Sequence, residues 1–103
     1  MTPKVGEVYI LGYQGKVRPV IIMSREDGHA LRELSLFVPL TKESRPSKYE
    51  VALPHVPWLK FQSYANVQGL GSVGHYELTD PRGRFDASVI RQIKDAIRWA
   101  LDL

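Results

Sequence analysis

The sequence predicts a small, mainly β barrel that is covered by one C-terminal α-helix. Short extended segments, separated by glycine, proline and polar residues, fill the first three quarters of the chain, and one clear helical repeat closes it. At 103 residues the chain has room for one hydrophobic core. We therefore expect a single domain over residues 1–103.

Six segments read as strands because they are rich in β-branched and aromatic residues. The second contains Val20-Ile21-Ile22-Met23 without alternation, which predicts a strand buried on both faces. Residues 13–16 read as a turn, and residues 58–61 as one helical turn. The expected strands are Glu7–Leu11, Val17–Ser24, Leu34–Leu40, Tyr49–Leu53, Ser63–Gln68 and Leu70–Val73.

The helix is the clearest element. Asp86 supplies an N-cap side chain at its start. Such a helix must bury its apolar stripe, and the barrel is the nearest surface. The residues that recur at helical spacing are Val89, Ile90, Ile93, Ala96, Ile97, Ala100 and Leu101.

The composition excludes several kinds of chemistry. There is no cysteine, which removes disulfides, thiolate nucleophiles and cysteine-based zinc sites. His29, His55 and His75 are scattered without metal-ligand spacing, so we expect no metal site and no cofactor. No Gly-rich phosphate loop precedes a helix. Nothing resembles a signal peptide or membrane span, and we expect a soluble, cytoplasmic protein without a membrane partner.

Positive charge gathers at two places. The net charge is +3 and the isoelectric point is about 9.3. These values are compatible with a polyanionic partner. Lys42, Arg45 and Lys48 share one loop-like stretch, while Lys16 and Arg18 flank the start of the second strand. Taken alone, the loop is better explained as solvated surface.

Several polar residues stand at strand ends, where they could converge on one rim of a small barrel: Arg18, Thr41, Ser63 and Gln68. Cleavage of RNA by its own 2′-hydroxyl needs no metal, but it needs charge stabilisation at the phosphate, a proton acceptor and a proton donor. A guanidinium presents a planar fork of donors to two phosphate oxygens. From spacing alone, however, an arginine before a proline is an ordinary surface residue.

The order and spacing of five segments resemble the MazF/PemK toxins: Gly6–Tyr9, Arg18–Ser24, Val38–Thr41, Ser63–Gln68 and Leu78, followed by the helix. The resemblance implies an SH3-like barrel of the type shared by MazF, PemK and CcdB, assembled as a homodimer. It implies the toxin of a type II toxin–antitoxin system, a metal-independent, sequence-selective endoribonuclease. Such a toxin cuts single-stranded mRNA to 2′,3′-cyclic phosphate and 5′-hydroxyl ends and inhibits translation. Its partner is a MazE/PemI-like antitoxin that covers the RNA groove.

Carried over by position, the resemblance makes Arg18 and Thr41 the catalytic pair. Arginine holds its proton too strongly to be a good base, so Arg18 is expected to stabilise the phosphate, with proton donation as a second role left open, and Thr41 is expected to have a positioning role. Many relatives place an acidic residue before the glutamine and a basic one after it, whereas here Val67 precedes and Gly69 follows. The residues expected to bind RNA are Lys16, Lys42, Arg45, Lys48, Ser63, Gln68 and His75.

Two alternatives stay open. A CcdB-like toxin would share the fold, cleave no RNA and bind DNA gyrase through its C-terminal helix, where Trp99 and residues 101–103 could be contacts. Packing of Trp99 on the barrel is the plainer explanation. A degenerate family member would bind antitoxin and RNA without turnover.

Overall fold

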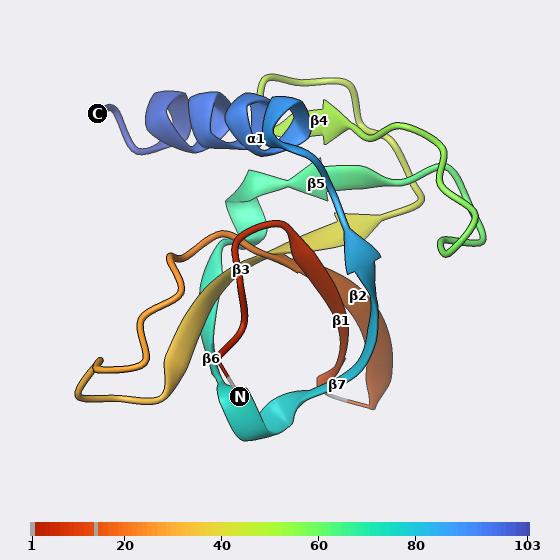
Figure 1. Ribbon diagram of the computed structural model, residues 1–103. Helices are drawn as coiled ribbons and strands as arrows, with labels where there is room; N and C mark the ends of the chain where they lie inside the picture. The colour runs from red at the N-terminus through yellow and green to blue at the C-terminus, as the bar shows by residue number, and fades with distance from the viewer. Residues whose placement is uncertain (1, 14) are drawn as a thin grey trace.

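A computed structural model describes residues 2–13 and 15–103, and it shows a strongly curved sheet with one helix across its open end (Figure 1). The expected mainly β architecture with a C-terminal helix is confirmed. The strands are β1 (Glu7–Tyr13), β2 (Lys16–Ile22), β3 (Leu34–Thr41), β4 (Glu50–Ala52), β5 (Tyr64–Asn66), β6 (Gly71–Gly74) and β7 (Leu78–Arg84).

The seven strands pair antiparallel in the order β4-β5-β3-β2-β1-β7, and β6 pairs with β3. Strand β3 is the centre of this arrangement because it pairs with three neighbours along its length. It meets β6 over Leu34–Phe37, β2 over Phe37–Pro39 and β5 over Leu40–Thr41. This change of partners bends the sheet and brings β4 and β5 under the helix.

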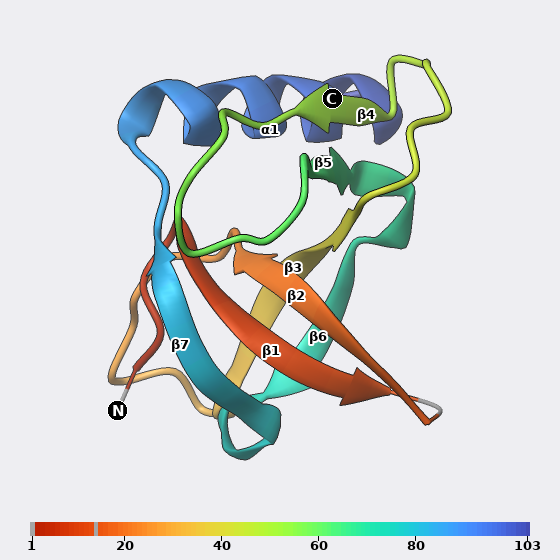
Figure 2. The ribbon, with the colours of Figure 1, turned by 90° about the vertical axis from the view of Figure 1, so that its right-hand side faces the viewer.

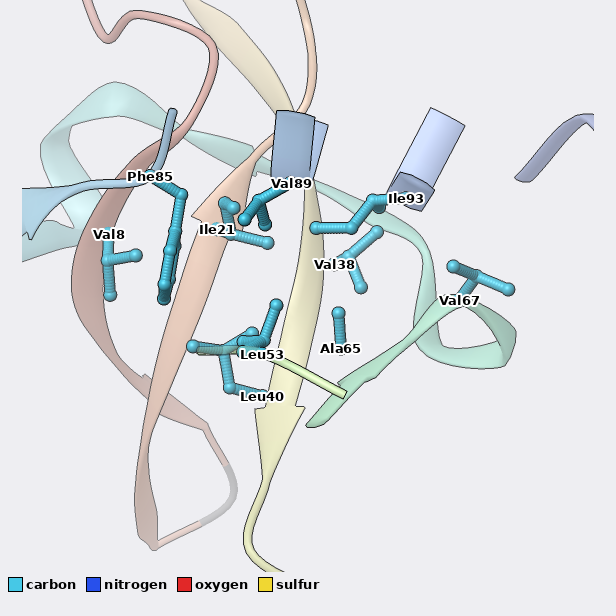
Figure 3. Close-up of a cluster of buried hydrophobic side chains, with 10 residues drawn as sticks. All are labelled: Val8, Ile21, Val38, Leu40, Leu53, Ala65, Val67, Phe85, Val89 and Ile93. Atoms are coloured by element: carbon cyan, nitrogen blue, oxygen red, sulfur yellow. The ribbon is translucent and has the colours of Figure 1, made fainter. Parts of the chain in front are cut away.

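Strand β2 separates two hydrophobic clusters, as its unbroken apolar run predicted. Ile21 belongs to a cluster beneath the helix that also includes residues of β1, β3 and β5 (Figure 3). Val20 and Ile22 point to the other face, into a cluster with β1, β6 and the start of β7. All three side chains are at most 1% exposed. The residues of the first cluster are Val8, Ile21, Val38, Leu40, Leu53, Ala65, Val67, Phe85, Val89 and Ile93.

The helix α1 spans Ala87–Ala100 and lies over β4 and β5 in both ribbon views (Figures 1 and 2). The Asp86 carboxylate accepts the Val89 N–H at 3.1 Å, so the predicted N-cap is confirmed. Val89 and Ile93 are buried, and the apolar stripe continues against the core through Ala96, Ile97 and Ala100. Leu101, expected on that stripe, follows the helix and is 55% exposed.

Two expected elements differ from the structure. Strand β5 ends at Asn66, because the Asn66 side chain accepts the Gln68 N–H at 3.1 Å and starts the 3₁₀ helix η1 (Val67–Gly69). Gln68 therefore lies on a helical turn and not on a strand. Residues 58–61 form a turn and bends rather than helix, with the Leu59 N–H bonded to the Val56 carbonyl at 3.2 Å. The turn expected at residues 13–16 includes Gln14, which lies outside the described residues.

Strand β7 and the preceding 3₁₀ helix η2 (His75–Glu77) were not predicted. Of the β7 side chains only Leu78 is buried, so the strand shows no hydrophobic alternation, and Pro81 and Gly83 interrupt it. It pairs with β1 through an irregularity between Val8 and Ile10. Its partner strand, and not its own composition, makes it a strand.

Pro19 ends the pairing of β2 with β3. The Met23 N–H donates to the Leu36 carbonyl at 2.9 Å, and hydrogen-bonded pairs alternate along an antiparallel ladder. The next such pairs are Ile21 with Val38 and then Pro19 with Leu40. Pro19 has no N–H to donate, and the ladder stops at Val20 opposite Pro39. The two strands therefore run on past the end of their ladder.

In the described part of the chain, α1 falls short of the length and apolar character that crossing a membrane would require.

Candidate functional site

A groove of about 530 Å³ opens where the β2–β3 ladder ends. Its walls come from four places in the chain: the start of β2 with Ile10 of β1, the end of β3 with the residues after it, the segment between β4 and β5, and β7. The lining residues are Ile10, Lys16, Val17, Arg18, Pro19, Leu40, Thr41, Lys42, Glu43, Trp58, Leu59, Lys60, Phe61, Ser63 and Arg82.

The register places Arg18 opposite Thr41. The last paired residues are Val20 and Pro39; Arg18 lies two residues beyond on β2 and Thr41 two residues beyond on β3. Side chains two apart on a strand share a face, so both project from the same side of the sheet. Pro19 also favours an extended backbone at Arg18. A guanidinium and a hydroxyl thus line the same groove at the mouth of the open ladder.

The Thr41 hydroxyl organises the chain that follows β3. Its oxygen accepts the Glu43 N–H at 3.2 Å and lies 3.4 Å from the Glu43 carbonyl, to which it can donate. Such a turn is a common use of threonine outside regular structure. Thr41 therefore fixes the path by which Lys42 and Glu43 enter the groove.

Positive charge dominates the groove. Five cationic side chains line it against one carboxylate, that of Glu43. The Arg82 guanidinium forms a half-exposed ion pair with Asp80 at 2.8 Å, and the other four cations form no ion pair in the described part of the chain. A groove of this kind attracts polyanions. The cations are Lys16, Arg18, Lys42, Lys60 and Arg82.

The segment between β4 and β5 forms the outer wall and is held firmly. Figure 2 shows it descending beside β7 and β1 before it returns to β5. The Gln62 side-chain amide donates to the Leu53 carbonyl at 2.7 Å, and the Ser63 hydroxyl donates to the Phe61 carbonyl at 3.0 Å. Trp58 packs on Gly83 of β7, where a Cβ would lie 2.4 Å from the indole ring. Its ring also meets Phe85 at 5.0 Å.

Phe61 presents an aromatic ring to the groove. It is 52% exposed, and the ammonium groups of Lys42 and Lys60 lie over it at 4.9 and 5.6 Å from the ring centroid. Exposed aromatic rings among cations are the usual platform on which unpaired bases stack in single-strand binding proteins.

The groove collects five of the nine residues predicted from the sequence: Lys16, Arg18, Thr41, Lys42 and Ser63. Ser63 is 9% exposed, and its hydroxyl donates a hydrogen bond to the backbone of the same segment. It therefore stabilises the fold as well as lining the groove.

The other four predicted residues lie elsewhere. The Arg45 N–H donates to the Glu50 carboxylate at 2.9 Å. Lys48 turns to the helix end, its ammonium 5.4 Å from the Trp99 ring centroid. Gln68 lies on η1 and His75 on η2, at opposite ends of β6. None of the four lines the groove in the described part of the chain.

Sequence reasoning missed Glu43, Trp58, Lys60, Phe61 and Arg82. Lys60 and Phe61 carry a signal, a cation beside an aromatic residue, but the sequence predicts a helical turn for their segment. Arg82 gave none, because the strand that carries it was not predicted.

A second hollow of about 320 Å³ adjoins the groove and shares Lys16 and Arg18 with it. Its floor is apolar, formed by Leu11, Val20 and Phe37, and it reaches Gly69 next to Gln68. Arg18 thus stands between two depressions. In the part of the chain described, no three carboxylates or histidines gather as metal ligands would.

Trp99 packs within the fold. Its ring meets Tyr49 edge-on with centroids 4.9 Å apart, and the side chain stays 48% exposed. The simpler of the two sequence interpretations, packing against the barrel, accounts for this contact.

Comparisons with known proteins show which solved structures share this fold. An endoribonuclease in complex with its cognate antitoxin from a mycobacterial species has a TM-score of 0.87 and 26% identity, over 98% of this chain and 96% of that one. The Mycobacterium tuberculosis toxin MazF-mt6 has a TM-score of 0.83 and 26% identity, over 94% of this chain and 97% of that one. MazF from Deinococcus radiodurans, 18% identical, shares the fold with a TM-score of 0.84 over 100% of this chain and 99% of that one.

A comparison with curated protein sequences finds no match. The sequence profile of the PemK-like, MazF-like toxins of type II toxin–antitoxin systems matches residues 4–101, nearly the whole chain. The chain belongs to this toxin family.

Proposed function

We propose that this toxin is a metal-independent, sequence-selective endoribonuclease. It cuts single-stranded mRNA by attack of the 2′-hydroxyl on the neighbouring phosphate, leaving 2′,3′-cyclic phosphate and 5′-hydroxyl ends, and so inhibits translation. The observation that carries the proposal is the basic groove at the end of the β2–β3 ladder, with Arg18 and Thr41 at its mouth.

Each part of the groove has a task in this reaction. Arg18 offers a planar pair of donors to the two non-bridging phosphate oxygens, where negative charge grows in the transition state. Thr41 positions the chain beside it through the Glu43 N–H. The remaining cations follow the phosphate backbone. The half-exposed ring of Phe61 supports a single-stranded substrate, because only an unpaired base can stack on it.

The partners follow from the same surface. A MazE/PemI-like antitoxin with an acidic segment would neutralise the toxin by covering the groove, since its carboxylates would meet the cations that otherwise bind phosphate. Solved relatives include a MazE–MazF complex from Deinococcus radiodurans. We further propose that the chain is a single domain, acts in the cytoplasm and works as a homodimer, which light scattering of the purified protein would test.

The deciding experiment incubates purified protein with a long unstructured RNA in excess chelator, beside an Arg18→Ala variant. We expect discrete cuts with cyclic-phosphate ends from the wild type, and a loss of about 100-fold or more in rate for the variant. Arg18 is exposed, so the variant should keep its thermal stability. If the wild type is folded but leaves the RNA intact, the nuclease hypothesis is wrong. The two remaining hypotheses would then be a toxin that binds DNA gyrase and a family member that binds RNA without turnover.

A further inference from the structure

The groove supplies cations in excess, but the proposed reaction also requires a group that accepts a proton. The 2′-hydroxyl must lose its proton as its oxygen attacks the phosphorus. Lysine and arginine side chains carry no acceptor when protonated. The acceptor therefore has to be found among the few remaining polar groups that line the groove.

Most of those groups are unsuitable. The Ser63 hydroxyl is nearly buried and donates to the Phe61 carbonyl. The Thr41 hydroxyl accepts the Glu43 N–H, and a hydroxyl is in any case a weak base. His29, His55 and His75 do not line the groove. Tyr9 lies in the core away from it, and burial, with a smaller contribution from the charge and hydrogen bond of Glu7, raises the pKa of its hydroxyl.

Glu43 is the one carboxylate among the lining residues of the described chain. Its backbone is fixed by two contacts with the Thr41 hydroxyl, two residues away, so it is tied to the residue that faces Arg18. Its side chain is exposed and free to reach a substrate. The charged groups that line the groove with it come from β2, from the residue before it, from the segment between β4 and β5 and from β7: Lys16, Arg18, Lys42, Lys60 and Arg82.

We propose that the Glu43 carboxylate is the proton acceptor of the reaction; the inference rests on the proposed nuclease function. Glu43 takes the proton from the 2′-hydroxyl as O2′ bonds to phosphorus. The bond from phosphorus to O5′ breaks, and O5′ takes a proton from water. Glu43 then returns its proton to water, so the enzyme is regenerated and the products are the cyclic phosphate and the 5′-hydroxyl.

A carboxylate in a groove that binds a polyanion has an electrostatic consequence. It repels the substrate phosphates, so it weakens binding of the ground state. A residue that bound only the phosphate backbone would not carry this charge. Removing the charge should therefore have opposite effects on binding and on chemistry, which is the signature to measure.

The test compares Glu43→Gln and Glu43→Asp with the wild type, and uses Glu26→Gln as a matched loss of one negative charge at an exposed position outside the groove. Single-turnover cleavage is measured across pH. Affinity is measured on the same RNA with a 2′-deoxy nucleotide at the cut site. Thermal unfolding confirms that each variant is folded.

We expect Glu43→Gln to cleave about 100-fold or more slowly, to bind the uncleavable RNA at least as tightly as the wild type, and to change the dependence of the cleavage rate on pH. Glu43→Asp should recover part of the rate, and Glu26→Gln should match the wild type.

Wild-type rates in Glu43→Gln would overturn the assignment and leave the nuclease intact. So would a loss of rate matched by an equal loss of affinity with an unchanged pH profile, which would make Glu43 a binding residue. A wild type that cleaves no RNA would overturn the nuclease and this assignment together.

Discussion

The two ends of strand β2 differ although they belong to one continuous strand. At the end that pairs with β3, Val20, Ile21 and Ile22 are almost fully buried and divide two hydrophobic clusters. At the other end, Lys16, Val17 and Arg18 are exposed and line a groove. Pro19 stands between them. The comparison teaches that, in this strand, the change from buried core to groove wall falls at the residue that lacks an N–H.

The largest expected effect is on the paired end. Ile21→Ala removes a fully buried side chain from the cluster beneath the helix and should lower the free energy of unfolding by about 2–5 kcal/mol. Val17→Ala, on the open end of the same strand and 71% exposed, should change it by less than about 0.5 kcal/mol. Urea denaturation of both variants measures the difference. Similar losses of stability in the two variants would show that the two ends of β2 contribute equally to the fold.

On the open end the effect should fall on activity. Thr41→Val keeps the shape of the side chain but removes the hydroxyl that holds the Glu43 N–H, and cleavage should slow by about 100-fold. Thr41→Ser retains the hydroxyl and should retain most of the rate. Single-turnover kinetics measure the cleavage rates of both variants. A wild-type rate in Thr41→Val would show that the Thr41 hydroxyl has no role in cleavage.

The groove wall can be disturbed from β7. Gly83→Ala places a Cβ 2.4 Å from the Trp58 ring, and the strain should cost about 1–3 kcal/mol of stability. RNA affinity should fall with it, because Trp58 anchors the segment that carries Phe61. Gly12→Ala is the control, since a Cβ there meets nothing within 4 Å. Thermal unfolding and RNA titration measure the stability and the RNA affinity of both variants. If Gly83→Ala behaves like Gly12→Ala, Trp58 can move aside without cost.

The aromatic ring in the groove should contribute to affinity and not to fold. Phe61→Leu should weaken binding of single-stranded RNA by roughly 5- to 100-fold, the contribution of one stacked base. Phe61→Tyr should preserve it. Tyr76→Leu removes an aromatic ring that is 88% exposed but lies outside the groove, and it should bind normally. Fluorescence anisotropy reads all three, and unchanged binding by Phe61→Leu would exclude stacking there.

The smallest effect separates two lysines of one loop. Lys42 lines the groove, whereas Lys48 lies over Trp99. Lys42→Ala should reduce the slope of log affinity against log salt concentration by about 0.7, as one lost phosphate contact does. Lys48→Ala should leave the slope unchanged. If both variants reduce the slope, both lysines contact phosphate and the whole loop binds RNA.

The comparison also shows what the sequence can predict. The buried end of β2 and the helix were recognisable because repeated apolar residues report local burial, and Asp86 marks a helix start by its own side chain. The pairing of Arg18 with Thr41 was suggested by resemblance, but their place opposite one another follows from a register that only the folded sheet defines.

Which residues of β7 and of the loop after β3 line the groove could not be predicted from the sequence. Arg82 reaches the groove on a strand whose side chains are nearly all exposed, so no pattern marks it. Lys48 and Arg45 looked equivalent to Lys42 because a sequence shows that charges are close along the chain, not which way the loop turns. Glu43 was overlooked because its importance depends on what the other groove residues lack.

Pro19 has a further consequence for the sheet. A strand edge that offers unpaired N–H and C=O groups is a template on which another chain can add a strand and begin to aggregate. Here the edge at the groove carries a proline at the next pairing position, so an incoming backbone would find a donor missing. The opening can thus admit an extended ligand through side-chain contacts while it discourages the protein from polymerising through the same edge.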